Sequence, residues 1–197
     1  PCKMRYDRDD DMMITGKRHD FRVDYDVGFD ATGRIAGLDV MLASRCGYSV
    51  DFSGPVNDRA MLHIDNVYHL PNLKMVSHRC KTHTQSSTAF RGFGGPQGMF
   101  GIETVIEAIA KHLKLDPQAV RRVNLYGAHT SLVTHYDQTL EDWIGDKVLD
   151  QLEQESNYAQ RRVTVAEFNA RHATRKRGLA ISPLKFGISF TATMLNQ

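Results

Sequence analysis

A glycine-rich loop that carries two aromatic rings and one cation is the part of the chain best suited to chemistry. Residues 88–98 read TAFRGFGGPQG, with four glycines within seven residues. Glycine lacks a Cβ atom and permits positive φ, so the backbone can approach a partner closely and aim its N–H groups. Pro96 is typical of a first helical turn, and helix N-termini attract anions and oxo groups. The loop therefore favours a site for a buried cofactor or planar ligand.

The same residues also have simpler explanations. A glycine-rich turn can be purely structural, and phenylalanines such as Phe90 and Phe93 usually pack in a core because each buries a large apolar area. Arg91 can form a structural ion pair. Arg59, judged only from the spacing around it, is a residue on a helix surface. The loop alone leaves these alternatives open.

The loop resembles, nearly letter for letter, the signature of the molybdenum-binding subunit of the xanthine dehydrogenase and oxidase family. The likeness covers essentially the whole chain and is weakest between about residues 128 and 176. It is carried by further segments as well: Asp7-Arg8, Asp11-Met12, Ile14-Thr15-Gly16, Arg59-Ala60, His63, Asp65-Asn66, Cys80-Lys81-Thr82, Arg121-Arg122, Asn124-Leu125-Tyr126, the run from Lys185 to Thr191 and Leu195-Asn196-Gln197.

The resemblance implies that residues 1–197 are an internal fragment of a molybdopterin-binding domain with a molybdenum–molybdopterin cofactor. In the whole enzyme it also implies 2Fe-2S clusters and FAD. The residues that it assigns to the cofactor site are Phe90, Arg91, Gly92, Gly94 and Gly95. Arg91 would serve the metal through the cofactor site and not as a direct ligand. The chain has no Cys-x-x-Cys or His-Glu-x-x-His spacing, which fits a cofactor that brings its own sulfur ligands.

The resemblance also implies a slot for a flat substrate. Phe93 would stack on a heteroaromatic ring, Phe190 would meet the ring edge-on, and Thr191 would donate a hydrogen bond to it. Arg59 would be the catalytic residue, because its planar, permanently charged guanidinium stabilises the negative charge that purine hydroxylation builds up. Aldehyde-preferring relatives lack an arginine at this position.

The implied activity is that of xanthine dehydrogenase, which hydroxylates hypoxanthine and xanthine to urate in the cytoplasm and passes electrons through iron–sulfur centres and FAD to NAD. The implied partners are a purine, the remaining segments of the molybdenum subunit, the iron–sulfur/FAD subunit or domains, and a second copy in a homodimer. The family's general-base glutamate would lie outside these residues, so we expect the fragment alone to be inactive. Alternatives are an aldehyde or other N-heterocycle hydroxylase and, from another class, a non-catalytic scaffold domain.

The composition is that of an ordinary globular chain, with 197 residues, 41% hydrophobic and 24% charged. A net charge of +2 and scattered basic residues argue against nucleic-acid binding. The basic cluster from Arg171 to Arg177 is typical of a solvated helix end. No apolar run reaches the roughly 18 residues that span a bilayer, and no signal-peptide pattern opens the chain.

The elements around the loop indicate an α+β fold of mixed strands and helices. Apolar spacing predicts an antiparallel hairpin over residues 21–43 and further strands at 2–7, 73–81 and 179–194. Helices are predicted at 56–64, 96–114, 117–125 and, as one or two helices closed by Gly178, at 146–175. Glu103 and Glu107 are predicted to be an exposed or loop-supporting pair. A loop near residues 128–143 is a possible boundary between two lobes.

Overall fold

A three-stranded sheet forms the centre of the chain, and its middle strand is the longest. The computed structural model describes residues 1–127 and 129–187. The strands are β1 (Phe21–Phe29), β2 (Ile35–Gly47) and β3 (Leu73–Lys81), in the order β1-β2-β3. β1 pairs antiparallel with β2, and β3 pairs parallel with it. The predicted hairpin is confirmed, with its second strand continuing to Gly47, and so is the strand at 73–81.

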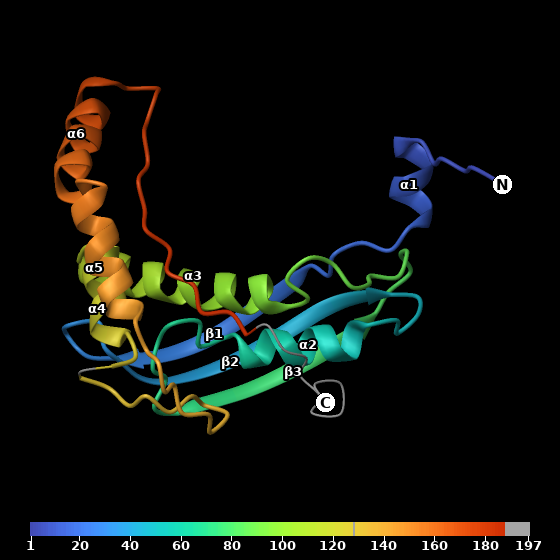
Figure 1. Cartoon of the computed structure of the whole chain (residues 1–197), viewed down its shortest axis with the longest axis horizontal. Coiled ribbons are helices and arrows are strands. Elements are labelled where there is room, and N and C mark those ends of the chain that lie inside the picture. The colour runs from blue at the N-terminus through green and yellow to red at the C-terminus, as the bar shows by residue number, and fades with distance from the viewer. Residues whose placement is uncertain (128, 188–197) are drawn as a thin grey trace.

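Two helices cover one face of this sheet. α2 (Ser53–Leu62) and α3 (Gly95–Leu113) lie side by side across the strands (Figure 1). The covered face can be read along β2, where Leu38 and Val40 are buried and the intervening Asp39 is exposed. On α3, a stripe at helical spacing is buried against the sheet and α4: Ile102, Val105, Ile106 and Ile109. The core therefore lies between one sheet face and two helices.

Three further helices gather at one end of the sheet. They are α4 (Pro117–Asn124), α5 (Gly145–Glu155) and α6 (Tyr158–Arg171). The side chain of Asp116 accepts a hydrogen bond from the backbone N–H of Gln118 at 2.9 Å, which caps α4 as the sequence predicts. The long helical segment at 146–175 is a pair of helices that breaks at Asn157, whose φ of 50° is left-handed.

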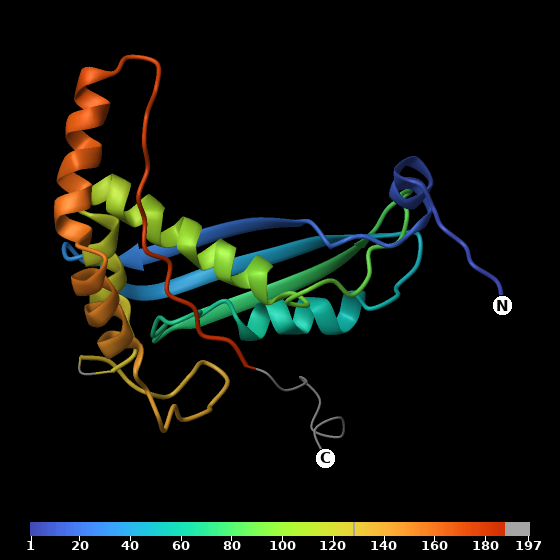
Figure 2. The same ribbon diagram turned by 45° about the horizontal axis from the view of Figure 1, so that its top comes forward.

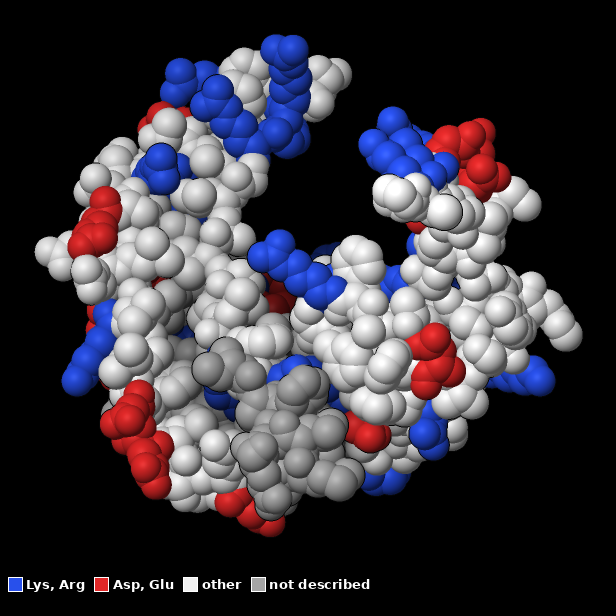
Figure 3. All heavy atoms as spheres, turned by 45° about the vertical axis from the view of Figure 1, so that its right-hand side comes forward, with Lys and Arg blue, Asp and Glu red and all other residues white. Residues whose placement is uncertain are grey.

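Two arms rise from opposite ends of the sheet and enclose a hollow. α6 forms one arm, and α1 (Arg8–Ile14) stands at the other end (Figures 1 and 2). Lys and Arg side chains gather at the tip of the α6 arm, whereas basic and acidic side chains lie side by side at the tip of the α1 arm (Figure 3). The basic residues beyond α6, among them Arg175 and Arg177, are exposed, as expected for a solvated helix end.

Residues 172–187 run back from the outer end of α6 and cross α3 (Figure 2); we call this segment the strap. The strand predicted at 179–194 is wrong over 179–187, because the strap pairs with side chains and not with a neighbouring strand; its remainder falls outside the described residues. Gly178 does not close α6, which ends at Arg171.

The strand predicted at residues 2–7 is also wrong. These residues are exposed and lack regular structure, and Asp7 instead caps α1 by accepting from the N–H of Asp10 at 3.0 Å. The described residues of the predicted 128–143 loop contain one isolated bridge, between Val133 and Thr139. The two-lobe division stays a prediction. In the part of the chain that the structure describes, no helix has the length and apolar composition needed to cross a bilayer.

Candidate functional site

The glycine-rich loop joins the end of β3 to α3 through three successive left-handed residues. The φ angles are 89° at Gly92, 52° at Phe93 and 99° at Gly94. A phenylalanine in this region is unusual, because its Cβ crowds the following carbonyl oxygen at a cost of roughly 1–2 kcal/mol. The loop closes on itself: the N–H of Phe93 donates to the carbonyl of Phe90 at 2.7 Å, and that of Gly95 to Gly92 at 3.0 Å.

The close approach expected at the loop glycines is made to a neighbouring helix. A Cβ atom on Gly94 would overlap the carbonyl oxygen of Val56, and one on Gly98 would overlap that of Ala60. Both carbonyls belong to α2. Glycine is thus required here for the N-terminal turn of α3 to pack backbone to backbone on α2, which fixes the loop relative to that helix.

The loop side chains project from this frame toward residues 18 and 52. Phe90 is 53% exposed, with the Arg18 guanidinium 4.4 Å from its ring centroid. Arg18 also donates from Nη2 to the carbonyl of Arg91 at 2.5 Å. Phe93 is half-buried and meets Phe52 edge-on, with ring centroids 6.0 Å apart. Phe90 is therefore not a core residue, and the side chain of Arg91 is exposed.

Two buried polar atoms beside the loop have no hydrogen-bond partner among the described residues. They are Nη1 of Arg18 and Oε1 of Gln97. The amide nitrogen of Gln97 donates to the carbonyl of His19 at 3.0 Å, so the side chain is fixed with its oxygen unused. Buried unpaired polar groups are costly, so these two atoms beside the loop are candidates to contact a polar ligand.

Arg59 lies on α2 and faces the strap. Its Nη2 atom donates to the carbonyl oxygen of Gly187 at 2.7 Å, and its guanidinium lies 5.0 Å from the ring centroid of Phe186. The ring of His63 lies 5.3 Å from the same phenylalanine. Burial lowers the pKa of His63, and the nearby charge of Arg59 acts in the same direction. The imidazole is therefore neutral at pH 7.

The sequence-predicted site residues fall into two groups. Arg59 approaches the start of α3, because a Cβ on Gly95 would lie 3.1 Å from the Phe186 ring that covers the guanidinium. Phe90, Arg91 and Phe93 lie instead with Arg18 and Phe52. Phe190 and Thr191 lie outside the described residues, so their roles stay predictions.

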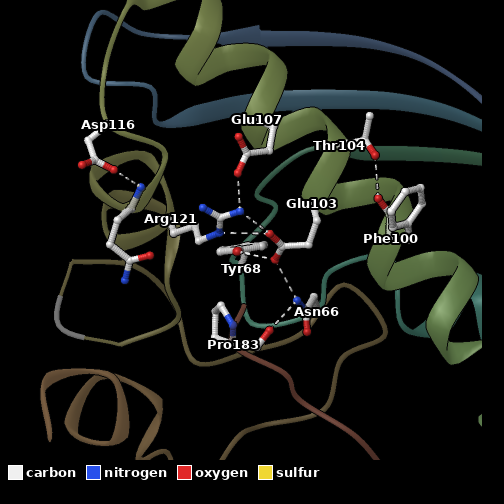
Figure 4. A network of polar contacts seen from close by, with 10 residues as sticks. Asn66, Tyr68, Phe100, Glu103, Thr104, Glu107, Asp116, Arg121 and Pro183 are labelled. Atoms are coloured by element: carbon white, nitrogen blue, oxygen red, sulfur yellow. Dashed lines mark hydrogen bonds and ion pairs between the residues drawn. The ribbon is translucent and has the colours of Figure 1, made fainter. Parts of the chain in front are cut away.

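Sequence reasoning missed a buried polar network between α3 and α4 (Figure 4). Arg121 is 6% exposed and binds Glu103 at 2.9 Å and Glu107 at 2.6 Å. The hydroxyl of Tyr68 donates to Glu103 at 2.5 Å. Of the two predicted roles, exposure holds for Glu107, which is 50% exposed, but not for Glu103, which is 14% exposed. Glu103 has the predicted loop-supporting role, because it accepts from Asn66 and Tyr68 in the loop after α2. The i, i+4 spacing of the two glutamates was the only signal, and it does not reveal the partner.

Among residues 1–127 and 129–187, no group of three or more His, Cys, Asp or Glu side chains is placed to hold a metal ion. The groups that the loop offers to a ligand are therefore of another kind: a guanidinium donor, an amide oxygen and aromatic faces. Such a set suits a planar, hydrogen-bonding molecule that carries negative charge.

The sequence also matches a family of domains that bind a cofactor. A family model described as a molybdopterin cofactor-binding domain matches residues 1–125. Xanthine dehydrogenase of Emericella nidulans and xanthine dehydrogenase/oxidase of Gallus gallus are each 45% identical over 197 residues. A nicotinate hydroxylase of Emericella nidulans is 43% identical over 199 residues. These matches cover 100% of this chain but only 14 to 15% of the relatives.

Solved structures show the same fold. Aldehyde oxidoreductase from Desulfovibrio gigas matches with a TM-score of 0.72 at 23% identity, over 86% of this chain and 18% of that one. Quinoline 2-oxidoreductase from Pseudomonas putida 86 matches with a TM-score of 0.70 at 24% identity, over 84% and 22%. The α+β assignment is confirmed. The chain therefore belongs to the molybdopterin cofactor-binding domain family, and over its whole length it is similar to part of several xanthine dehydrogenases.

Proposed function

We propose that the protein hydroxylates hypoxanthine and xanthine to urate, and that this chain forms one wall of the substrate and cofactor site. The relatives support a molybdenum hydroxylase of the xanthine dehydrogenase type. The observation that carries the purine assignment is Arg59, a half-buried guanidinium fixed on α2 beside the start of α3. A permanent cation in this place stabilises negative charge on a heterocycle and gives an aldehyde no comparable advantage.

The residues around the loop fit molybdopterin. The unpaired Nη1 of Arg18 is a donor for phosphate or ring oxygen, and the unpaired Oε1 of Gln97 is an acceptor for ring N–H groups. The five loop residues proposed to seat the cofactor, with Arg91 acting through that site, are Phe90, Arg91, Gly92, Gly94 and Gly95. When bound, the cofactor supplies the molybdenum centre at which the ring carbon is hydroxylated.

The chain's own residues bind and orient the purine. Phe93, half-buried at the loop, would stack on the ring, while Phe190 and Thr191 would meet its edge and donate to it. Arg59 would stabilise the negative charge that develops during hydroxylation, a contribution of about 2.7–4 kcal/mol per donor in comparable sites. No general base is assigned to this chain, so the fragment alone would be inactive.

The rest of the activity belongs to the longer protein. We propose that 2Fe-2S clusters and FAD pass the electrons to NAD, that the complete protein works in the cytoplasm, and that it forms a homodimer. The chain spans 14% of the curated relatives it matches, so these parts would come from other segments or subunits.

The test compares two substrates in the full-length enzyme carrying Arg59→Met. The kcat/KM for xanthine is expected to fall about 10²- to 10³-fold while that for an aromatic aldehyde stays within a few-fold. Arg22→Met, which removes an exposed arginine on β1, is the matched control and leaves both unchanged. Survival of xanthine turnover in Arg59→Met would end the purine assignment.

The second candidate is a hydroxylase of another N-heterocycle, favoured by the nicotinate hydroxylase at 43% identity. Parallel assays of nicotinate and xanthine distinguish the two. A scaffold without catalysis predicts no molybdenum in the purified native protein, so metal analysis decides that alternative.

A further inference from the structure

Two adjacent residues in the turn that follows α2 hold the strap in place. Asp65 and Asn66 are both fully buried, and Asn66 adopts a left-handed φ of 47°. Asparagine tolerates this conformation better than most residues, because its short polar side chain bonds locally. The two side chains consequently point at strap residues 183–185, which are 117 to 120 positions away in sequence.

Asn66 pairs with the strap backbone as a neighbouring strand would. Its Nδ2 atom donates to the carbonyl of Pro183 at 2.9 Å, and its Oδ1 atom accepts from the N–H of Lys185 at 3.2 Å. Nδ2 also donates to Glu103 at 3.1 Å. Because Glu103 is itself held by Arg121 and Tyr68, the amide has one usable orientation (Figure 4). A flipped amide would turn its NH2 group toward the N–H of Lys185 and its oxygen toward two acceptors, the Pro183 carbonyl and the Glu103 carboxylate.

Asp65 fixes the side chain of the same strap residue. Its Oδ2 atom accepts from the hydroxyl of Tyr126 at 2.8 Å and forms an ion pair with Lys185. The ammonium also lies 5.1 Å from the Tyr126 ring centroid and 5.4 Å from that of Tyr136. Removal of either charge would leave the other buried without its partner, which is costly.

Apolar burial does not hold this part of the strap. Leu184 is 67% exposed and Phe186 is 48% exposed, whereas Ile181 is buried. The directional contacts from Asp65 and Asn66 are therefore what locate residues 183–185. The next two residues, Phe186 and Gly187, are those that contact the guanidinium of Arg59. A shift of the strap at Lys185 would move both contacts, since consecutive Cα atoms are only about 3.8 Å apart.

We propose that Asn66, assisted by Asp65, is a positioning residue for purine specificity: it clamps the strap so that Phe186 and Gly187 hold the Arg59 guanidinium in its working orientation. This inference rests on the proposed role of Arg59 in purine hydroxylation. Asn66 acts through the strap and through Arg59, without touching the substrate.

The experiment uses the full-length enzyme with Asn66→Gly, which removes the side chain and tolerates the positive φ. Xanthine kcat/KM is expected to fall on the order of ten- to a hundredfold, while aromatic aldehyde turnover stays within about twofold. Hydrogen exchange in the peptide that covers residues 179–187 becomes faster, and molybdenum content is unchanged. Asn72→Gly is the matched control, because Asn72 also donates to a backbone carbonyl, that of Ala36, away from the strap.

A double-mutant cycle separates positioning from general structural support. If the clamp acts through Arg59, Asn66→Gly causes no further loss of xanthine turnover in an Arg59→Met background. Equal losses in both backgrounds, or parallel losses of aldehyde turnover and molybdenum, would overturn the proposal.

The same data distinguish its failure from failure of the proposed function. If Arg59→Met leaves xanthine turnover intact, the proposed function is wrong. If Arg59→Met abolishes turnover but Asn66→Gly changes neither turnover nor exchange in residues 179–187, the clamp alone is wrong.

Discussion

The guanidinium of Arg59 donates from Nη2 to the backbone carbonyl of Gly187 at 2.7 Å, across 128 residues of chain. Helix α2 and the strap therefore meet at the side chain to which we assign charge stabilisation. The planar fork of arginine can hold a carbonyl and present a flat face to the Phe186 ring at the same time.

Arg59→Lys keeps the charge but loses the fork. A lysine ammonium is a point charge on a flexible stem and cannot reproduce the planar arrangement. We expect xanthine kcat/KM to fall between that of the wild type and that of Arg59→Met, with aldehyde turnover unchanged. Steady-state kinetics on both substrates measures this. A lysine variant as active as the wild type on xanthine would show that charge alone is sufficient.

Gly98→Ala is expected to destabilise the full-length protein by about 1–3 kcal/mol, because the new Cβ would overlap the carbonyl of Ala60 and push α3 away from α2. Urea unfolding measures the loss. Gly28→Ala is the control, since a Cβ at Gly28 meets nothing within 4 Å. Equal midpoints for the two variants would contradict the backbone contact between α2 and α3.

Arg121→Met should cost about 3–5 kcal/mol in the free energy of unfolding, because Glu103 would stay buried without its cation. The contrasting variant is Arg171→Met, which breaks an exposed i, i+4 pair with Glu167 and should cost no more than about 0.5 kcal/mol. Chemical denaturation of both variants tests the difference. Similar costs would mean that the buried network contributes little.

Phe93 offers a test of backbone strain. At a φ of 52°, glycine relieves the strain that any larger residue carries, whereas alanine retains it. Phe93→Gly should therefore be more stable than Phe93→Ala by roughly 1 kcal/mol, although glycine usually destabilises relative to alanine. Thermal unfolding of the two variants gives the order directly. The reverse order would indicate an ordinary φ at this residue.

Stability should fall in mild acid. Burial lowers the pKa of both His63 and His135 below the ordinary 6.5, so the unfolded chain binds protons that the native protein does not. The contribution of these histidines to the free energy of unfolding is then fully present above pH 6.5. It is lost progressively as the pH falls from 6.5 toward their lowered pKa values. Urea midpoints across this range measure the slope. His135→Gln should flatten it.

Local sequence signals were sufficient for the elements that frame the site. Pro96 and the apolar stripe from Ile102 to Ile109 predict α3, which begins at Gly95 as expected. Asp116 and Pro117 predict α4 to within one residue. The loop and its helices were predictable because capping residues, proline and apolar periodicity act over a few residues.

The strap was not predictable from the same signals. Its Ile and Phe content favours a strand, but a strand needs a free sheet edge, and residues 179–187 cross α3 instead. Asn66 and Glu103 carry no local mark of their roles, because their partners lie up to 119 residues away. Pairing over such separations depends on tertiary packing and leaves no local signal in the sequence. Asp65 and Asn66 belong to the segments that carry the family resemblance, but the resemblance implies no function for either residue.

Gly94 and Gly98 contact backbone carbonyls of α2, so backbone atoms alone fix the position of α3 relative to α2. A helix held in this way keeps its position whatever side chain it presents at residue 59. Under our proposal for Arg59, the contacts that position α2 and the cofactor loop are therefore independent of the side chain that selects the substrate. A single codon could then redirect the substrate range while the cofactor loop stays where it is.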